Sequence, residues 1–199
     1  MRKFFIMKKN IYLMLVFLTF VSLAQKSRKD EGIIMGLKGG LNVSNFMGDI
    51  DDQSIRTSVH LGLVSEIVVS DKFSLQPELL YSGQGSSDGR VQGFSRNKLS
   101  YLTLPIMGKF AVTEGLSFQA GPQIGFLLSA KNKTDTSNDK IKDIKTLDFG
   151  ICAGLEYDFS SRYFIQGRYN LGLSDTGISG DSNKRVANSV FQISIGYLF

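Results

Sequence analysis

The chain has 199 residues, of which 23 are Lys or Arg and 18 are Asp or Glu, giving a formal net charge of +5 at pH 7. This length suits one domain with a sizeable core and is short for two ordinary domains. The single cysteine excludes an internal disulfide, so a folded exported chain must gain its stability elsewhere.

The first 24 residues have the layout of a secretory signal peptide. A basic start that includes Arg2 and Lys3 precedes an apolar run over residues 11–24, and Ser22 and Ala24 occupy the small-residue positions of a cleavage site. A membrane anchor is the alternative, but a helix needs about 20 apolar residues to cross a bilayer. We therefore expect a signal peptide over residues 1–24, a disordered leader over 25–34 and the folded domain over 35–199.

Most of the net positive charge lies in the expected signal peptide. It holds four of the 23 basic residues and none of the 18 acidic ones, so 19 basic and 18 acidic residues remain after cleavage. A nearly neutral mature chain has no electrostatic footprint for a polyanion. We therefore expect no nucleic acid among its partners.

Eight segments with a period-2 alternation of apolar and polar residues follow the leader. This alternation is typical of β-strands whose two faces meet different environments. The segments lie at residues 35–46, 57–69, 73–84, 99–112, 115–128, 146–159, 162–174 and 188–199. The sequence therefore predicts an all-β fold.

The connections between these segments alternate in length. Those after the second, fourth and sixth segments are tight, whereas those after the first, third, fifth and seventh are long and polar. In an antiparallel sheet, all the tight turns then lie at one end and all the long loops at the other. Bacterial outer-membrane barrels combine an even strand number with short periplasmic turns and long extracellular loops. We predict an eight-stranded antiparallel transmembrane β-barrel with this layout.

The composition of the two strand faces favours lipid on the outside. In the segment at 146–159 the odd positions are apolar, while the even positions include Asp148, Gly150 and Glu156. The polar faces carry few of the Lys and Glu residues of a water-exposed sheet, and segments of this length suit tilted transmembrane strands. A secreted soluble barrel with an apolar interior would show the same alternation and is the alternative.

Aromatic residues gather near the ends of the segments, where the girdles of a membrane barrel would lie. The last segment, FQISIGYLF, alternates up to Phe199, and we expect it to pair with the first segment because strands in lipid must close on each other. The aromatic residues expected in the girdles are Phe46, Phe73, Tyr81, Tyr101, Phe110, Phe126, Phe159, Tyr163, Tyr197 and Phe199.

Ionisable residues on the polar faces are expected to point into the barrel. Eight strands leave an interior that side chains fill, which predicts a plugged core and no channel. Buried charges need partners, so we expect a lumenal charge network in which three cations pair with three carboxylates. Its members are Lys38, Glu66, Glu78, Lys109, Glu156 and Arg168, and His60 and Asp148 share the same parity.

Catalysis is not expected. A serine nucleophile needs a base beside it, and the only histidine, His60, has Ser58 and Ser65 nearby in sequence. Ser58 lies near a strand end and Ser65 on the opposite strand face. With one His and one Cys, no metal cluster is visible, so we expect no enzyme, no cofactor and no metal.

Five stretches carry a family resemblance: GLKGGLNVSNF, LQPELLYSGQG, YLTLPIMGKF, GPQIGFLLSAK and FQISIGYLF. They resemble the PorT-like outer-membrane beta-barrel family, whose members are often labelled porin family proteins. The resemblance implies an eight-stranded barrel in the outer membrane of a Gram-negative bacterium. The founding member is needed for protease secretion through a type IX system, but no motif of this chain carries that role.

The expected function is that of a small outer-membrane protein with a structural, adhesive or secretion-accessory role. Its expected partners are outer-membrane lipid and lipopolysaccharide, and other envelope or secretion proteins at the long loops. Contact with lipopolysaccharide phosphates is expected from Lys131, Lys133, Lys140 and Lys142. A small-solute porin is the first alternative, and a secreted soluble barrel that binds a small apolar ligand is the second.

Overall fold

The computed structural model describes residues 33–48, 53–88, 96–133, 138–140, 145–174 and 186–199. The expected signal peptide and residues 25–32 of the expected leader lie outside these ranges. No helix in the described ranges is long and apolar enough to cross a membrane. The strands are β1 (Ile33–Gly48), β2 (Gln53–Ser54), β3 (Arg56–Ser70), β4 (Phe73–Asp88), β5 (Arg96–Ala111), β6 (Leu116–Lys133), β7 (Asn138–Lys140), β8 (Leu147–Asp158), β9 (Tyr163–Gly172) and β10 (Val186–Leu198).

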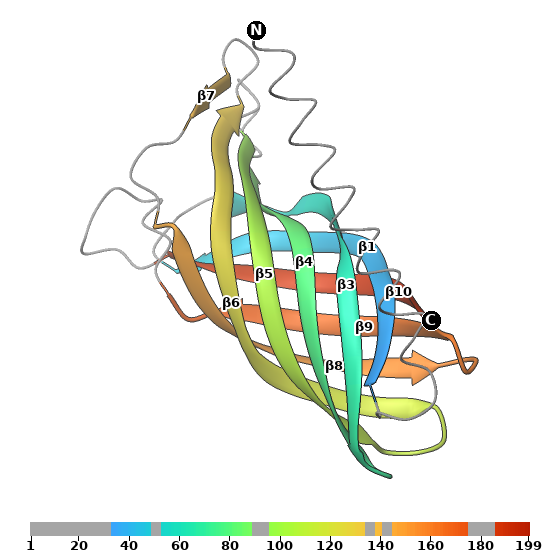
Figure 1. Ribbon diagram of the computed structural model, residues 1–199. Coiled ribbons are helices and arrows are strands. Elements are labelled where there is room, and N and C mark those ends of the chain that lie inside the picture. Colours follow the sequence, from blue (N-terminus) through green and yellow to red (C-terminus); the bar gives the residue numbers. More distant parts are fainter. Residues whose placement is uncertain (1–32, 49–52, 89–95, 134–137, 141–144, 175–185) are drawn as a thin grey trace, which may run out of the picture.

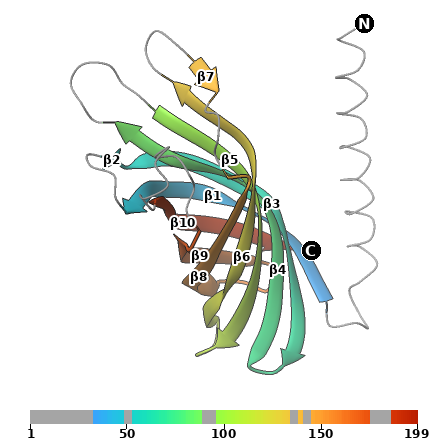
Figure 2. The same ribbon diagram turned by 90° about the vertical axis from the view of Figure 1, so that its left-hand side faces the viewer.

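Eight long strands close into an antiparallel barrel, as the sequence predicts (Figures 1 and 2). Each pairs with the next long strand along the chain, and β10 pairs with β1 from Gly36 opposite Leu198 to Gly48 opposite Val186. The predicted pairing of the last segment with the first is confirmed. A closed barrel has no free edge, so its backbone groups are paired within the wall as lipid requires.

The strands of the long-loop end run further than the sequence predicts. β4 continues to Asp88, β5 begins at Arg96 and β6 continues to Lys133, while β7 pairs with β6. Figure 1 shows β5 and β6 projecting beyond the other strands. The apolar alternation ends where a strand leaves the lipid. In water a strand can continue with polar residues on both faces, so the pattern stops before the strand does.

The start of the barrel also differs from the prediction. β1 begins at Ile33, two residues before the expected domain boundary, because Ile33 and Ile34 pair with Ile67 and Glu66 of β3. The last two residues of the expected leader are therefore part of the wall.

The tight turns and the C-terminus share one end of the barrel. Between β5 and β6, the Val112 N–H donates to the Leu116 carbonyl at 2.8 Å, and Gly115 adopts φ +80°. Such a positive φ favours glycine, which lacks the Cβ that would clash. Next to the β8–β9 turn, the Leu198 N–H donates to the Arg162 carbonyl at 2.7 Å. This end corresponds to the periplasmic side of an outer-membrane barrel, and the other end is extracellular.

The wall turns apolar residues outward and polar residues inward. Leu61 and Ile193 are 64% and 57% exposed on the outer face, whereas Gln119 and Arg168 are 0% and 1% exposed inside. A soluble barrel would have the opposite arrangement, because burial of apolar surface drives its folding. The soluble-barrel alternative is therefore wrong, and the outer face is the lipid-facing one.

A cluster of buried apolar residues fills the extracellular end of the lumen and corrects part of the girdle prediction. We call it the apolar cluster. Its buried members are Phe46, Leu99, Tyr101 and Val186. Phe46 and Tyr101 were expected outside, but the alternation of β1 and β5 places them inside, where they are 6% and 1% exposed. A position near a strand end does not determine on which face of the sheet a side chain lies. In β1 and β5 these two aromatic side chains fill the interior of the barrel.

At the periplasmic end, aromatic rings do form a continuous row. Phe159 stacks on Tyr163 with ring centroids 5.9 Å apart, Tyr163 lies 4.9 Å from Tyr197, and Tyr197 lies 5.8 Å from Phe199. Tyr163 and Phe159 are about half exposed on the outside. These four residues occupy the position expected of an interfacial girdle.

Candidate functional site

The lumen is the part of the molecule where charged side chains converge. Even-numbered positions of β1, β3, β4, β8 and β9 and the odd position 109 of β5 face inward, so the residues of the expected network meet inside the wall. All but one of the six are buried to 6% exposure or less, and Glu66 retains slightly more contact with solvent. The structure sorts them into two groups at different depths.

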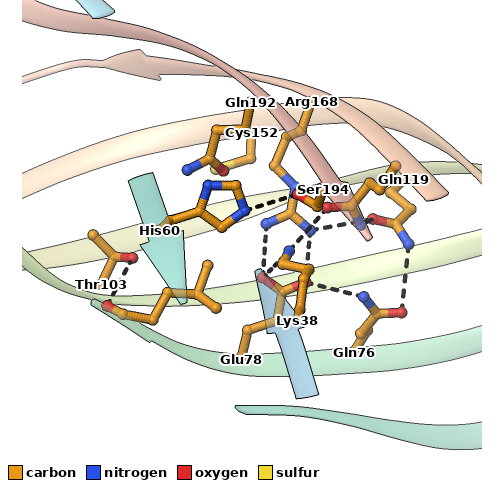
Figure 3. Close-up of polar contacts among 12 residues, drawn as sticks. Lys38, His60, Gln76, Glu78, Thr103, Gln119, Cys152, Arg168, Gln192 and Ser194 are labelled. Carbon is orange, nitrogen blue, oxygen red and sulfur yellow. Dashed lines mark hydrogen bonds and ion pairs between the residues drawn. The ribbon is translucent and has the colours of Figure 1, made fainter. Parts of the chain in front are cut away.

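The charged centre consists of Lys38, Glu78 and Arg168 (Figure 3). Glu78 Oε1 accepts from Arg168 Nη2 at 2.6 Å, and Glu78 Oε2 accepts from Arg168 Nη1 at 2.8 Å and from Lys38 Nζ at 2.7 Å. All three side chains have no solvent exposure. A two-pronged arginine contact and a second cation on the same carboxylate form a strong charge-assisted arrangement in which no charge is left without a partner.

The mouth group surrounds Lys109 near the periplasmic end. Its ammonium lies 2.6 Å from Glu156 Oε1, 3.2 Å from Asp158 Oδ2 and 3.3 Å from Glu66 Oε2. Ser74 Oγ also donates to Glu66 at 2.7 Å. Asp158 was not among the expected network members, although its even position on the polar face of β8 was visible in the sequence. Three carboxylates around one ammonium give this group an excess of negative charge.

Three glutamines connect the two charged groups. Gln119 and Gln166 donate to Glu156 Oε2 at 2.8 and 2.9 Å, and Gln76 donates to Glu78 Oε1 at 2.9 Å. Lys38 donates to Gln166 Oε1 at 2.9 Å. An amide both donates and accepts, so glutamine can join an anion to a cation across several strands. Sequence reasoning that counted only charges missed this layer.

His60 lies in a hydrogen-bonded chain that sequence proximity did not indicate. Its Nδ1 is 2.7 Å from Asn42 Oδ1 and its Nε2 is 2.9 Å from Ser194 Oγ. Ser58 instead donates to the Gly83 carbonyl. Ser194 is 134 residues from His60 in the chain, and only closure of the barrel brings the two together. Both are at most 3% exposed.

Asp148, which the sequence also places on an inward face, lies closer to the extracellular end. Its carboxylate accepts hydrogen bonds from Asn188 Nδ2 at 3.0 Å and from Ser174 Oγ. In the described part of the chain, no three His, Cys, Asp or Glu side chains are arranged to hold a metal ion.

A cavity of about 350 Å³ opens at the periplasmic mouth. Glu66, Lys109 and Asp158 line its inner side, and the tight turns at Asp71, Thr113 and Ser160 line its rim. Lys38, Glu78 and Arg168 are not among its lining residues. The cavity therefore stops at the mouth group and does not continue through the charged centre.

Residues 23–177 match the family described as outer membrane protein beta-barrel domain. Among solved structures, the chain resembles Ail, the attachment invasion locus protein of Yersinia pestis, with 15% identity, a TM-score of 0.51 and coverage of 85% of this chain and 100% of Ail. It also resembles Neisserial surface protein A, with 9% identity, a TM-score of 0.58 and coverage of 85% and 100%. No curated protein matches the chain.

Identities this low show a shared fold and leave individual roles open. The family match is to the broad barrel family, so membership of the narrower PorT-like group stays a prediction. A wall that turns its apolar side chains outward needs lipid around it, and the matched residues make up more than half of the sequence. The chain belongs to the outer membrane protein beta-barrel domain family and resides in the outer membrane.

Proposed function

We propose that this protein is a sealed outer-membrane barrel with a structural or adhesive role, which does not conduct solutes and is not an enzyme. The observation that carries the proposal is the charged centre, where Lys38, Glu78 and Arg168 fill the middle of the lumen with no side-chain exposure. An interior of eight strands is just wide enough for side chains to fill. A solute would have to break buried ion pairs in order to pass.

The apolar cluster supports the same proposal from the extracellular end. Leu99 and Val186 are 0% exposed and pack with Phe46 and Tyr101 across the lumen. A water-filled pore needs a polar, hydrated lining along its whole length. The small-solute porin is therefore the less favoured alternative.

Adhesion is the part of the proposal that uses the extracellular end. The projecting strands β5 and β6 hold backbone-paired structure beyond the barrel wall, which gives a partner a rigid surface to bind. Ail, which has a similar fold, was solved in complex with the heparin analogue sucrose octasulfate. A secretion-accessory role, implied by the PorT-like resemblance, is also compatible with a sealed barrel, and a protease-secretion assay in a deletion strain would test it.

Conductance in planar lipid bilayers tests the sealed state. The refolded protein is added to the bilayer in potassium chloride, and the same preparation is run boiled and unboiled on a gel to establish that barrels are present. We expect a band that shifts on boiling and no stepwise current. Reproducible unitary currents from a preparation with this gel shift would overturn the proposal in favour of a porin.

A further inference from the structure

The cavity at the periplasmic mouth, which we call the mouth cavity, has a charged side and an apolar side. Glu66, Lys109 and Asp158 line the charged side, and Ile34 and Val68 line the apolar side. Ile34 of β1 pairs with Glu66 of β3, and Val68 is two residues beyond Glu66 in the same strand. Residues directly opposite each other in antiparallel strands share a face, as do residues two apart in one strand. The two sides therefore meet at Glu66.

The charged side has acceptor sites that no other side chain fills. Lys109 Nζ lies 2.6 Å from Glu156 Oε1, but its distance to Asp158 Oδ2 is 3.2 Å. Among the described residues, Lys109 is the only side chain that donates to the Asp158 carboxylate. An ionised carboxylate can accept about four hydrogen bonds. The Asp158 side chain is also partly exposed beside the cavity, so its remaining acceptor sites are open to a ligand.

A serine hydroxyl beside these carboxylates gives a second and independent indication of a ligand. Ser117 of β6 is only 4% exposed and lines the mouth cavity. Its hydroxyl forms no hydrogen bond with another residue in the part of the chain that the structure describes. A buried hydroxyl without a partner has a desolvation cost. Ser117 pairs with Glu156, and Asp158 is two residues further along β8. A donor in the cavity can therefore contact Ser117 and Asp158 together.

The apolar side of the cavity is exposed to water. Ile34 and Val68 have the inward parity of Lys38 and His60, yet they are 37% and 49% exposed. Leu198 of β10 continues this side. An apolar group placed against these side chains would remove apolar surface from water, which is favourable. The cavity thus combines an anionic group, an unpartnered hydroxyl and an exposed apolar wall.

We propose that the mouth cavity binds a small alkylamine, in which a primary ammonium group ends a short alkyl chain. The ammonium group has three donors and contacts Asp158 and Ser117, while the alkyl chain lies against Ile34 and Val68. A metal ion fits less well, because Lys109 already lies between the three carboxylates of the mouth group. The volume of about 350 Å³ is that of a small-molecule pocket. The inference does not depend on the sealed or adhesive role.

Titration of the refolded protein in detergent micelles, followed by nuclear magnetic resonance, tests the proposal. The backbone amide shifts of Ser117 and Val68 report binding of n-butylammonium. Two matched probes are 1-butanol, which lacks the charge, and the ammonium ion, which lacks the alkyl chain. We expect saturable shifts at both residues with n-butylammonium and a dissociation constant about tenfold larger with either matched probe.

Variants of each side of the cavity locate the site. Asp158→Asn should weaken n-butylammonium binding about tenfold, because a charge-assisted hydrogen bond becomes a neutral one. Glu114→Gln removes a carboxylate from the β5–β6 turn outside the cavity lining and should bind as the wild type does. Val68→Thr exchanges one methyl group for a hydroxyl and should weaken binding about threefold. Val69→Thr makes the same exchange on the lipid-facing side and should have no effect.

A band that shifts on boiling establishes folding in every sample. Equal affinity for n-butylammonium and 1-butanol, or equal losses in Asp158→Asn and Glu114→Gln, overturns the proposal. Equal affinity for n-butylammonium and the ammonium ion also overturns it and assigns the cavity to a simple inorganic cation. Nα-acetyl-lysine amide carries the same alkylammonium group on a peptide unit. Tighter binding of this probe than of n-butylammonium overturns the small amine in favour of a lysine side chain of a partner protein.

Discussion

The middle and the extracellular end of the lumen are filled in opposite ways. In the charged centre, Glu78 holds two cations and each buried charge depends on a named partner. In the apolar cluster, Phe46, Leu99, Tyr101 and Val186 need only to match each other in volume. Removing one member therefore leaves an unpaired charge in the first region and a cavity in the second.

This difference indicates how a narrow barrel can be polar inside and still closed. The apolar residues of each strand face the lipid, so the polar residues that alternate with them face the interior. Ion pairs and hydrogen bonds between these polar side chains then close the middle of the lumen. The apolar cluster limits water entry from the extracellular end. The mouth group, with Asp158 32% exposed beside the cavity, is the wet end of the same lumen.

The largest expected effect is in the charged centre. Glu78→Leu leaves Lys38 and Arg168 without their carboxylate and should lower the free energy of unfolding by about 3–5 kcal/mol. Arg168→Met should cost less, because Lys38 still pairs with Glu78. Denaturant titration of barrels refolded into vesicles, with the gel shift as readout, measures both.

Glu66→Leu is the matched control for this prediction. Lys109 keeps Glu156 and Asp158 in that variant, and the Glu66 side chain is 14% exposed, so we expect a loss of about 1 kcal/mol. Equal losses at Glu78 and Glu66 would show that depth in the lumen does not govern the network.

A smaller loss is expected from the apolar cluster. Leu99→Ala opens a cavity among Phe46, Tyr101 and Val186 and should cost about 3 kcal/mol. Leu155→Ala, on the lipid-facing side where the side chain is 53% exposed, is the control and should cost less. The same vesicle titration applies, and a larger loss at Leu155 would contradict the assignment of the cluster as a packed core.

A substitution at Gly196, which contacts Phe164, tests side-chain packing without removing a charge or opening a cavity. A Cβ at Gly196 would overlap the buried ring of Phe164 on the neighbouring strand, so Gly196→Ala should cost about 1–3 kcal/mol through overpacking. Gly167→Ala adds the same methyl group with nothing within 4 Å and should leave stability unchanged. Matching denaturation midpoints for the two variants would remove the overpacking argument.

Thiol labelling gives the smallest change and reports directly on closure. Cys152 is the only cysteine of the sequence and is 3% exposed inside the barrel. A maleimide should label it slowly in the folded wild type and completely after boiling. We expect faster labelling in Glu78→Leu than in Glu66→Leu, since only the first opens the charged centre. Rapid labelling of the folded wild type would mean that the lumen is open.

Much of the fold was predictable from local pattern. Lipid on one side of every strand demands an apolar residue at every second position, so the alternation revealed eight strands, their faces and the pairing of β10 with β1. The inward parity of Lys38, Glu78 and Arg168 followed from the same rule. Where the strands leave lipid this demand ends, so the sequence predicts loops at Ser86 and Lys98, where β4 and β5 continue.

The sequence by itself determined the all-β architecture and which residues of each strand share a face, because both depend on residues adjacent in one strand. Only the tertiary structure decided which side chains meet across the lumen. The Ser194–His60–Asn42 chain, the glutamine layer and the place of Asp158 beside Lys109 join strands far apart in the sequence. Such contacts depend on the exact register between strands, and a period-2 pattern is unchanged when a strand slips by two residues.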